Sequence, residues 1–201
     1  MTRARDLASL GDNTSKLEQQ GMVKIIPSSV AVGSGTGSAS ASGTVTFSGV
    51  SSISINGVFS STYDNYRIVF GNLNGSGAQQ DVGLQLRKNG VNNSSSIYYR
   101  QYLNASSTSV SGARVATSSN WIVFAVRDQG PFQAILDIFN PNNATIKTGA
   151  LGFKAYGSTS ENSIIISSYT HDLASSADFD GFTLTPNSGT ASGTVLIYGY
   201  N

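Results

Sequence analysis

The chain has 201 residues, enough for one domain of ordinary size with a substantial core. Only 11% of the residues are charged and the formal net charge is +1, so the chain lacks the positive field that attracts nucleic acid or anionic lipid. It has no cysteine, which excludes disulfides, thiolate nucleophiles and cysteine-based zinc sites, and no apolar run reaches the roughly 20 residues of a membrane-spanning helix.

Residues 1–26 carry a disproportionate share of the charge and the strongest helix signals of the chain. Ser15 and Glu18 have the spacing of a capping box, and Gly21 stands where a helix often ends. Isolated helices below about 12–15 residues are marginal in water, so such a segment needs a surface on which to dock. We expect a helical or extended anchoring segment, with a frayed terminus as the alternative. Its expected contact residues are Arg3, Arg5, Asp6, Leu7, Leu10 and Leu17.

The anchoring segment contains charges throughout and no apolar block of the kind that forms a signal peptide. We therefore expect the protein to be made in a cytoplasm. Residues 27–43 follow, and they are small, uncharged and poor in large apolar side chains, which predicts a flexible linker. The spacing of Gly33, Gly35 and Gly37 lacks the offset, helix and acidic residue of a dinucleotide-binding turn.

Residues 44–201 alternate apolar and polar side chains at the two-residue period of a strand. About ten or eleven short strands without a helical period predict an all-β domain, an antiparallel β-sandwich of the jelly-roll type. The predicted strands are Thr44–Phe47, Ile53–Ile55, Tyr66–Phe70, Val82–Arg87, Ile97–Leu103, Trp121–Val126, Phe132–Phe139, Ile146–Tyr156, Ser163–Tyr169, Phe179–Leu184 and Thr194–Tyr200.

Turn signals separate these strands. Asn74-Gly75 and Asn89-Gly90 predict tight hairpins, because a type I′ turn needs two residues that tolerate positive φ. The core is expected to contain Phe47, Ile55, Tyr66, Ile68, Phe70, Leu84, Leu86, Trp121, Val123, Phe132, Ile135, Ile138, Phe153, Ile165, Phe179, Phe182, Leu184, Val195 and Ile197.

The stretch from Gly57 to Phe70 joins a turn, a bend rich in aromatic residues and a strand. Within it, Tyr63 to Tyr66 predict a turn held by aromatic packing and by a hydrogen bond from an Asp or Asn side chain to the backbone. We expect this joint to deliver Ile68 and Phe70 into the core.

Signals for catalysis are weak. His171 and Asp172 are adjacent, so their side chains point to opposite faces if the strand continues, and a triad needs three groups that converge. The Gly-x-Ser-x-Gly nucleophile elbow is absent from the sequence. We expect a protein that is not an enzyme and that carries no cofactor.

A metal site would have to use oxygen ligands. Asp178 to Gly181 is the most calcium-like cluster, but it lacks the spacing and the closing glutamate of an EF-hand. We expect a solvated turn there, without a metal.

The run Tyr98, Tyr99, Arg100, Gln101 and Tyr102 combines the residue types that dominate binding hot spots. On a strand, Tyr98, Arg100 and Tyr102 share one face, and Tyr99 and Gln101 share the other. Two interpretations stay open: contact with a ligand or partner through Tyr98, Tyr99, Arg100 and Tyr102, or ordinary packing of a sheet.

Three parts of the sequence together resemble structural proteins of tailed bacteriophages, namely tail fibres, head fibres and capsid decoration proteins. They are the opening TRARDLA at residues 2–8, the stretch SISINGVFSSTYDNY at residues 52–66 and the closing TVLIYGYN at residues 194–201. The middle of the β domain matches only in its strand pattern.

The resemblance implies an all-β protein of the virion, often a homotrimer, attached to the particle by a short N-terminal segment. Its partners would be capsid, portal or tail proteins, and its head domain could contact a host surface glycan. It brings no catalytic residues. The alternative function is a carbohydrate-binding β-sandwich module that is not part of a virion.

Overall fold

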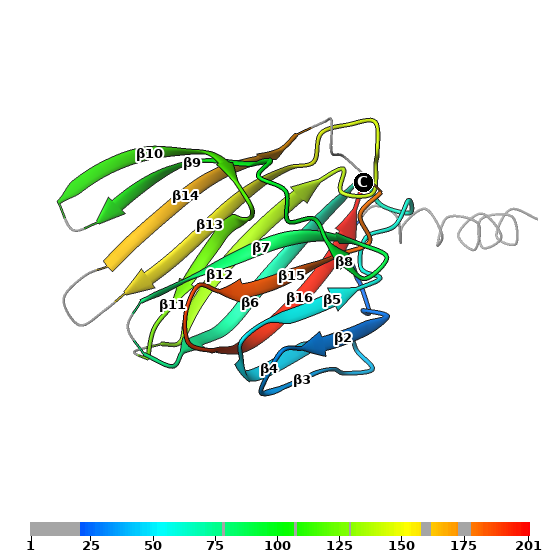
Figure 1. Cartoon of the computed structure of the whole chain (residues 1–201), viewed down its shortest axis with the longest axis horizontal. Helices are drawn as coiled ribbons and strands as arrows, with labels where there is room; N and C mark the ends of the chain where they lie inside the picture. Colours follow the sequence, from blue (N-terminus) through cyan, green and yellow to red (C-terminus); the bar gives the residue numbers. More distant parts are fainter. Residues whose placement is uncertain (1–20, 78, 107, 129, 158–161, 173–177) are drawn as a thin grey trace, which may run out of the picture.

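The computed structural model describes residues 21–77, 79–106, 108–128, 130–157, 162–172 and 178–201. These residues form two antiparallel sheets that pack face to face (Figure 1), which confirms the expected all-β sandwich. The arrangement is consistent with a jelly roll. The residues expected to anchor the chain, Arg3, Arg5, Asp6, Leu7, Leu10 and Leu17, lie outside the described residues.

The larger sheet contains ten strands. In spatial order they are β10 (Ser109–Ser118), β9 (Tyr98–Ser106), β14 (Asn162–His171), β13 (Gly149–Gly157), β12 (Phe132–Phe139), β6 (Asn65–Gly75), β16 (Ala191–Tyr200), β4 (Val45–Val50) and β3 (Thr36–Ala39), with β1 (Val23–Lys24) paired to β16. The smaller sheet runs β11 (Trp121–Val126), β7 (Gln80–Lys88), β15 (Gly181–Pro186), β5 (Ile53–Asn56) and β2 (Ser29–Val32), with β8 (Val91–Asn92) paired to β7.

The linker prediction for residues 27–43 is wrong where β2 and β3 form. Strand β2 pairs with β5 in the small sheet and β3 pairs with β4 in the large sheet, so this stretch crosses from one sheet to the other. Val30 and Val32 alternate with Ala31 and pack against the core, which fixes β2 in place. Gly35 makes the turn between the two strands with φ of 71°. The composition of residues 27–43 is typical of a flexible linker. Short runs of small residues can nevertheless form strands, because strand pairing uses the backbone.

The end of the predicted anchoring segment also belongs to the fold. Val23 and Lys24 of β1 pair with Gly199 and Tyr198 of β16, and the backbone N–H of Ile25 donates to the carbonyl of Ile197 at 2.8 Å. Residues 21–26 therefore belong to the sandwich.

Of the two predicted hairpins, one forms. Asn89 and Gly90 have φ of 51° and 77°, as a type I′ turn requires, and they join β7 to β8. The prediction at Asn74-Gly75 is wrong, because these residues end β6 in the large sheet and the next strand, β7, lies in the small sheet.

Most of the predicted core residues are buried, but three are not. Ile135 and Phe153 are 40% and 47% exposed, and Ile165 is only partly buried. On β12 the inward residues are Phe132, Ala134, Leu136 and Ile138, which leaves Ile135 on the outer face because side chains alternate along a strand. Phe153 pairs directly with Ile135 and shares its face.

The joint before β6 is organised around Tyr66. Its ring is fully buried, its hydroxyl donates to the carbonyl of Ser60 at 2.9 Å, and the N–H of Ser60 donates back to it at 2.8 Å. Phe59 meets the ring edge-on with centroids 4.8 Å apart. The backbone N–H of Asp64 donates to the side chain of Asn201 at 2.9 Å, so a side chain from the last residue of the sequence stabilises this turn.

Candidate functional site

Strand β9 distributes the run from Tyr98 to Tyr102 over three environments. Tyr98 lies in the core, Tyr99 and Gln101 face outward, and Arg100 and Tyr102 face a polar cleft between the sheets. The four residues named as possible contacts, Tyr98, Tyr99, Arg100 and Tyr102, are therefore divided among these environments.

Tyr98 is a structural residue. It is fully buried, its hydroxyl donates to the carbonyl of Asn93 at 2.7 Å, and it accepts the N–H of Leu86 at 3.0 Å. Trp121 and His171 pack edge-on against its ring. Burial raises the pKa of Tyr98 above its usual value. For Tyr98 the interpretation as sheet packing is correct.

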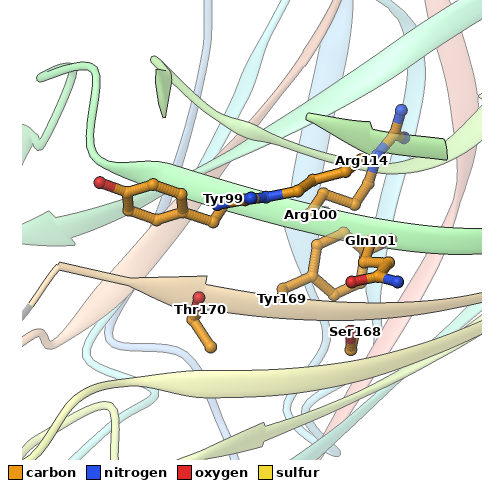
Figure 2. A pocket seen from close by; sticks show the side chains of 7 residues that line it. All are labelled: Tyr99, Arg100, Gln101, Arg114, Ser168, Tyr169 and Thr170. Atoms are coloured by element: carbon orange, nitrogen blue, oxygen red, sulfur yellow. The ribbon is translucent and has the colours of Figure 1, made fainter. Parts of the chain in front are cut away.

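Tyr99 and Gln101 border a hollow of about 330 Å³ on the outer face of the large sheet, with Arg114 from β10 and Ser168 and Thr170 from β14 (Figure 2). Gln101 pairs directly with Arg114 and with Ser168, so these polar side chains form one row across three strands. Arg100 and Tyr169 also line this hollow, so two arginines border it.

Arg100 and Tyr102 face inward, near the end of the large sheet formed by β9 and β10. The Arg100 guanidinium lies 4.5 Å from the centroid of the Tyr102 ring, and its Nη1 donates to the carbonyl of Ile122 at 3.1 Å. Together with Lys154 of β13 they line a polar cleft of about 200 Å³. This cleft is the strongest candidate for a binding site.

Lys154 is the unusual residue of this cleft, since a lysine that is only 6% exposed is rare in a protein interior. Burial, together with the positive charge of Arg100 and against the attraction of Asp81, lowers the pKa of Lys154 to about 8. The sequence reasoning placed Ile146–Tyr156 in a strand but missed this side chain, because a single lysine in an apolar strand resembles an outward-facing residue.

His171 belongs to the core. Its ring is fully buried between Tyr98 and Phe179, its Nδ1 donates to the backbone carbonyl of Asp172 at 3.1 Å, and its Nε2 accepts from the amide of Asn93 at 3.3 Å. Burial lowers the pKa of His171. Both ring nitrogens are occupied and no face of the ring is accessible to a substrate.

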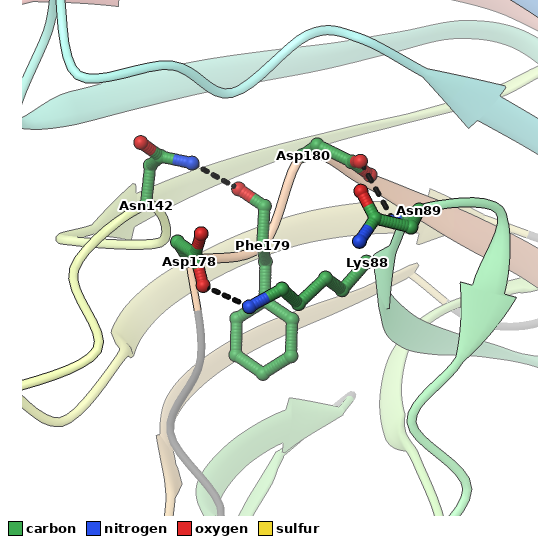
Figure 3. Close-up of polar contacts among 6 residues, drawn as sticks. All are labelled: Lys88, Asn89, Asn142, Asp178, Phe179 and Asp180. Carbon is green, nitrogen blue, oxygen red and sulfur yellow. Dashed lines mark hydrogen bonds and ion pairs between the residues drawn. The ribbon is translucent and has the colours of Figure 1, made fainter.

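The acidic turn Asp178 to Gly181 is tied to the β7–β8 hairpin (Figure 3). The carboxylate of Asp178 forms an ion pair with Lys88, and that of Asp180 accepts the backbone N–H of Asn89 at 2.8 Å. The pairing with Lys88 lowers the pKa of Asp178. Asn142 donates to the carbonyl of Phe179 at 2.9 Å and holds the other side of the turn. Among the described residues, no three acidic or histidine side chains gather as a metal site would require.

The outer face of the large sheet exposes large apolar side chains, a feature that the sequence reasoning missed. One row runs in register through six strands, from β16 to β9. It consists of Leu196, Val69, Ile135, Phe153, Ile166 and Leu103. We call the most exposed side chains of this sheet surface the apolar face: Leu103, Val110, Ile135, Leu151, Phe153, Ile164 and Ile166, each between 40% and 74% exposed.

Few charges lie on this surface, and the exposed Arg114 of β10 is one of them. Beside Ile135, on the same face, Arg67 and Asp137 form a bidentate ion pair with both contacts at 2.7 Å. A hollow of about 380 Å³ lies between Val69, Ile135 and Phe153. The surface is therefore apolar, corrugated and almost uncharged, which is the character of a protein contact.

Comparison of the chain with models of protein families, with curated proteins and with solved structures finds no match. The part of the chain that the structure describes contains no helix of the length and apolar character needed to cross a membrane.

Proposed function

We propose that this chain is a non-enzymatic structural protein of a tailed-bacteriophage particle, a fibre or capsid-decoration subunit that assembles with copies of itself through the apolar face. The observation that carries the proposal is the in-register apolar row across the outer side of the large sheet. The sequence resemblance at the N-terminus and at both ends of the β domain supports the phage assignment.

The exposure of the apolar face supports a stable contact between subunits. Its seven large apolar side chains are each between 40% and 74% exposed on one sheet surface, whereas exposed apolar side chains that are scattered singly are normal on a monomer. The resemblance gives three as the expected number of copies.

The oligomeric state in solution tests self-assembly. Phe153→Glu places a charge at the centre of the apolar face, and burying it without a partner would cost several kcal/mol, on the order of 2–5. We expect the wild-type protein to be a trimer by sedimentation and light scattering, and the variant to be a folded monomer by circular dichroism.

Val91→Glu is the matched control, because Val91 is 69% exposed on β8 of the small sheet, away from the apolar face. It should leave the oligomer intact. A wild-type protein that is monomeric at tens of micromolar, or a Phe153→Glu variant that assembles normally, would contradict the proposed interface. A monomer that binds neutral sugars would instead favour the alternative function, a carbohydrate-binding module outside a virion.

A further inference from the structure

The polar cleft is built by the inner faces of β9 and β13 and by the first residues of β7. Lys154, Ile165 and Asn104 form one in-register row across β13, β14 and β9, and Arg100 and Tyr102 lie beside it. Asp81 enters from the small sheet. The side chains from β9, β13 and β14 face inward, so the cleft stays accessible when the apolar face on the other side of the large sheet is covered.

The charges of the cleft do not cancel. Arg100 and Lys154 contribute two positive charges and Asp81 contributes one negative charge. Lys154 and Asp81 form no ion pair within 4 Å in the described structure, although their charges attract each other at longer range. The cleft therefore keeps a net positive charge, and beside the buried Lys154 an anion interacts more strongly than in water.

The hydrogen-bonding groups of the cleft are also incomplete. Among the described residues, the Nε of Arg100 and the side-chain oxygen of Asn104 are buried without a hydrogen-bond partner. Buried polar groups are almost always hydrogen-bonded, and an unpaired one costs about 1–3 kcal/mol. Donors from two cationic side chains thus point to an acceptor-rich anion, and the oxygen of Asn104 can accept from a hydroxyl.

We infer that this cleft binds the carboxylate of a small organic acid, with room for a sugar acid of about one ring. A carboxylate would accept hydrogen bonds from Lys154 and Arg100, and a neighbouring hydroxyl would donate to Asn104. The volume of about 200 Å³ limits the ligand to this size. The inference goes beyond the proposed function, because it requires neither a particle nor a second copy of the chain.

Titration calorimetry of the full-length protein with sodium glucuronate tests the inference, with acetate and glucose as comparison ligands. We expect glucuronate to bind with a Kd of about 1 mM or tighter and glucose not to bind. Displacement of glucuronate by acetate would identify any small carboxylate as the ligand. Binding of glucuronate that acetate does not displace would identify the sugar acid as the ligand.

Three variants assign the binding to the cleft. Lys154→Met keeps the length of the side chain, removes its charge and should weaken glucuronate binding about tenfold or more. Lys147→Met removes the same charge from an exposed loop and should leave the affinity unchanged. Asp81→Asn removes the competing carboxylate and should strengthen binding about threefold, a gain that a general loss of structure could not produce.

Two outcomes would overturn the inference: no binding of glucuronate at about 10 mM, or equal affinity in the wild type and in a folded Lys154→Met variant. The oligomeric state is measured in the same samples. A monomer that binds glucuronate would support the cleft and contradict only self-assembly, whereas an oligomer without binding would do the reverse.

Discussion

At the scale of single residues, His171 makes the stability of the fold sensitive to mild acid. Burial lowers the pKa of His171 in the folded state below the ordinary value of 6.5. As the pH falls, His171 therefore binds a proton more readily in the unfolded chain than in the folded chain, which favours unfolding. The neutral His171 side chain contributes fully to stability above the pKa that it has in the unfolded chain. This contribution is lost as the pH falls through the lower pKa that it has in the folded chain. Tyr98, Phe179 and Asn93 contact the ring without a charge, and Asp172 contributes a weaker attraction that raises the pKa.

We therefore expect the free energy of unfolding to fall between pH 7 and pH 5.5, measured by urea denaturation at both values. In His171→Phe, which keeps a ring between Tyr98 and Phe179, the difference between the two values should shrink. The variant loses the hydrogen bond from Asn93 at both pH values, so that loss cancels in the comparison. His171 is the only histidine, which leaves few other groups that titrate in this range. An unchanged difference in the variant would contradict this assignment.

At the scale of the elements, the joint before β6 shows how one aromatic residue fixes the start of a central strand. Tyr66→Ala should lower the free energy of unfolding by about 3–5 kcal/mol, because it removes a fully buried ring that packs on Phe59. Tyr66→Phe keeps the ring and removes only the hydroxyl that bridges the backbone of Ser60, at a cost of about 1–2 kcal/mol. Equilibrium unfolding in urea measures both variants. Equal costs for the two would show that the hydroxyl, and not the packing of the ring, holds the joint.

The same elements show what the sequence could predict. The strand Phe132–Phe139, which has one buried face, matches the prediction because its alternation reports burial directly. Edge strand β10 was missed because its side chains are mostly exposed on both faces, which leaves no alternation to read. Strands β2 and β3 were missed because their small residues resemble a linker, although pairing with β5 and β4 holds them.

The candidate site was predictable only in part, for a related reason. Tyr98, Arg100 and Tyr102 were correctly placed on one face of β9, but periodicity cannot say where along a strand the opposite sheet ends. Tyr98 lies under the small sheet and Arg100 lies at the edge of the cleft. Lys154 joins the site through its position in a neighbouring strand, which depends on register across the sheet. The apolar face was hidden for the same reason, because Ile135 and Phe153 resemble core residues in sequence.

At the scale of the whole molecule, the boundary between the anchor and the folded domain moves toward the N-terminus. The predicted boundary after residue 26 divides the sandwich, because β1 and Ile25 hydrogen-bond to β16, the strand that also joins β6 and β4. Ile25 additionally packs against the core. Residues 1–20 are left as the candidate for particle binding.

Two truncations separate these roles. A chain that begins at Gly21 keeps β1, whereas a chain that begins at Pro27 loses the pairing of β1 with β16, the hydrogen bond from Ile25 to Ile197 and the apolar contact of Ile25. We expect the shorter chain to be less stable than the longer one by about 1–3 kcal/mol in urea unfolding, from lost hydrogen bonds and one partly buried side chain.

Both chains should fail to join phage particles in a complementation assay that follows the tagged protein through particle purification. Incorporation of the chain that begins at Gly21 would place the particle contact on the sandwich itself, and equal stability of the two chains would show that β1 contributes nothing to the sheet.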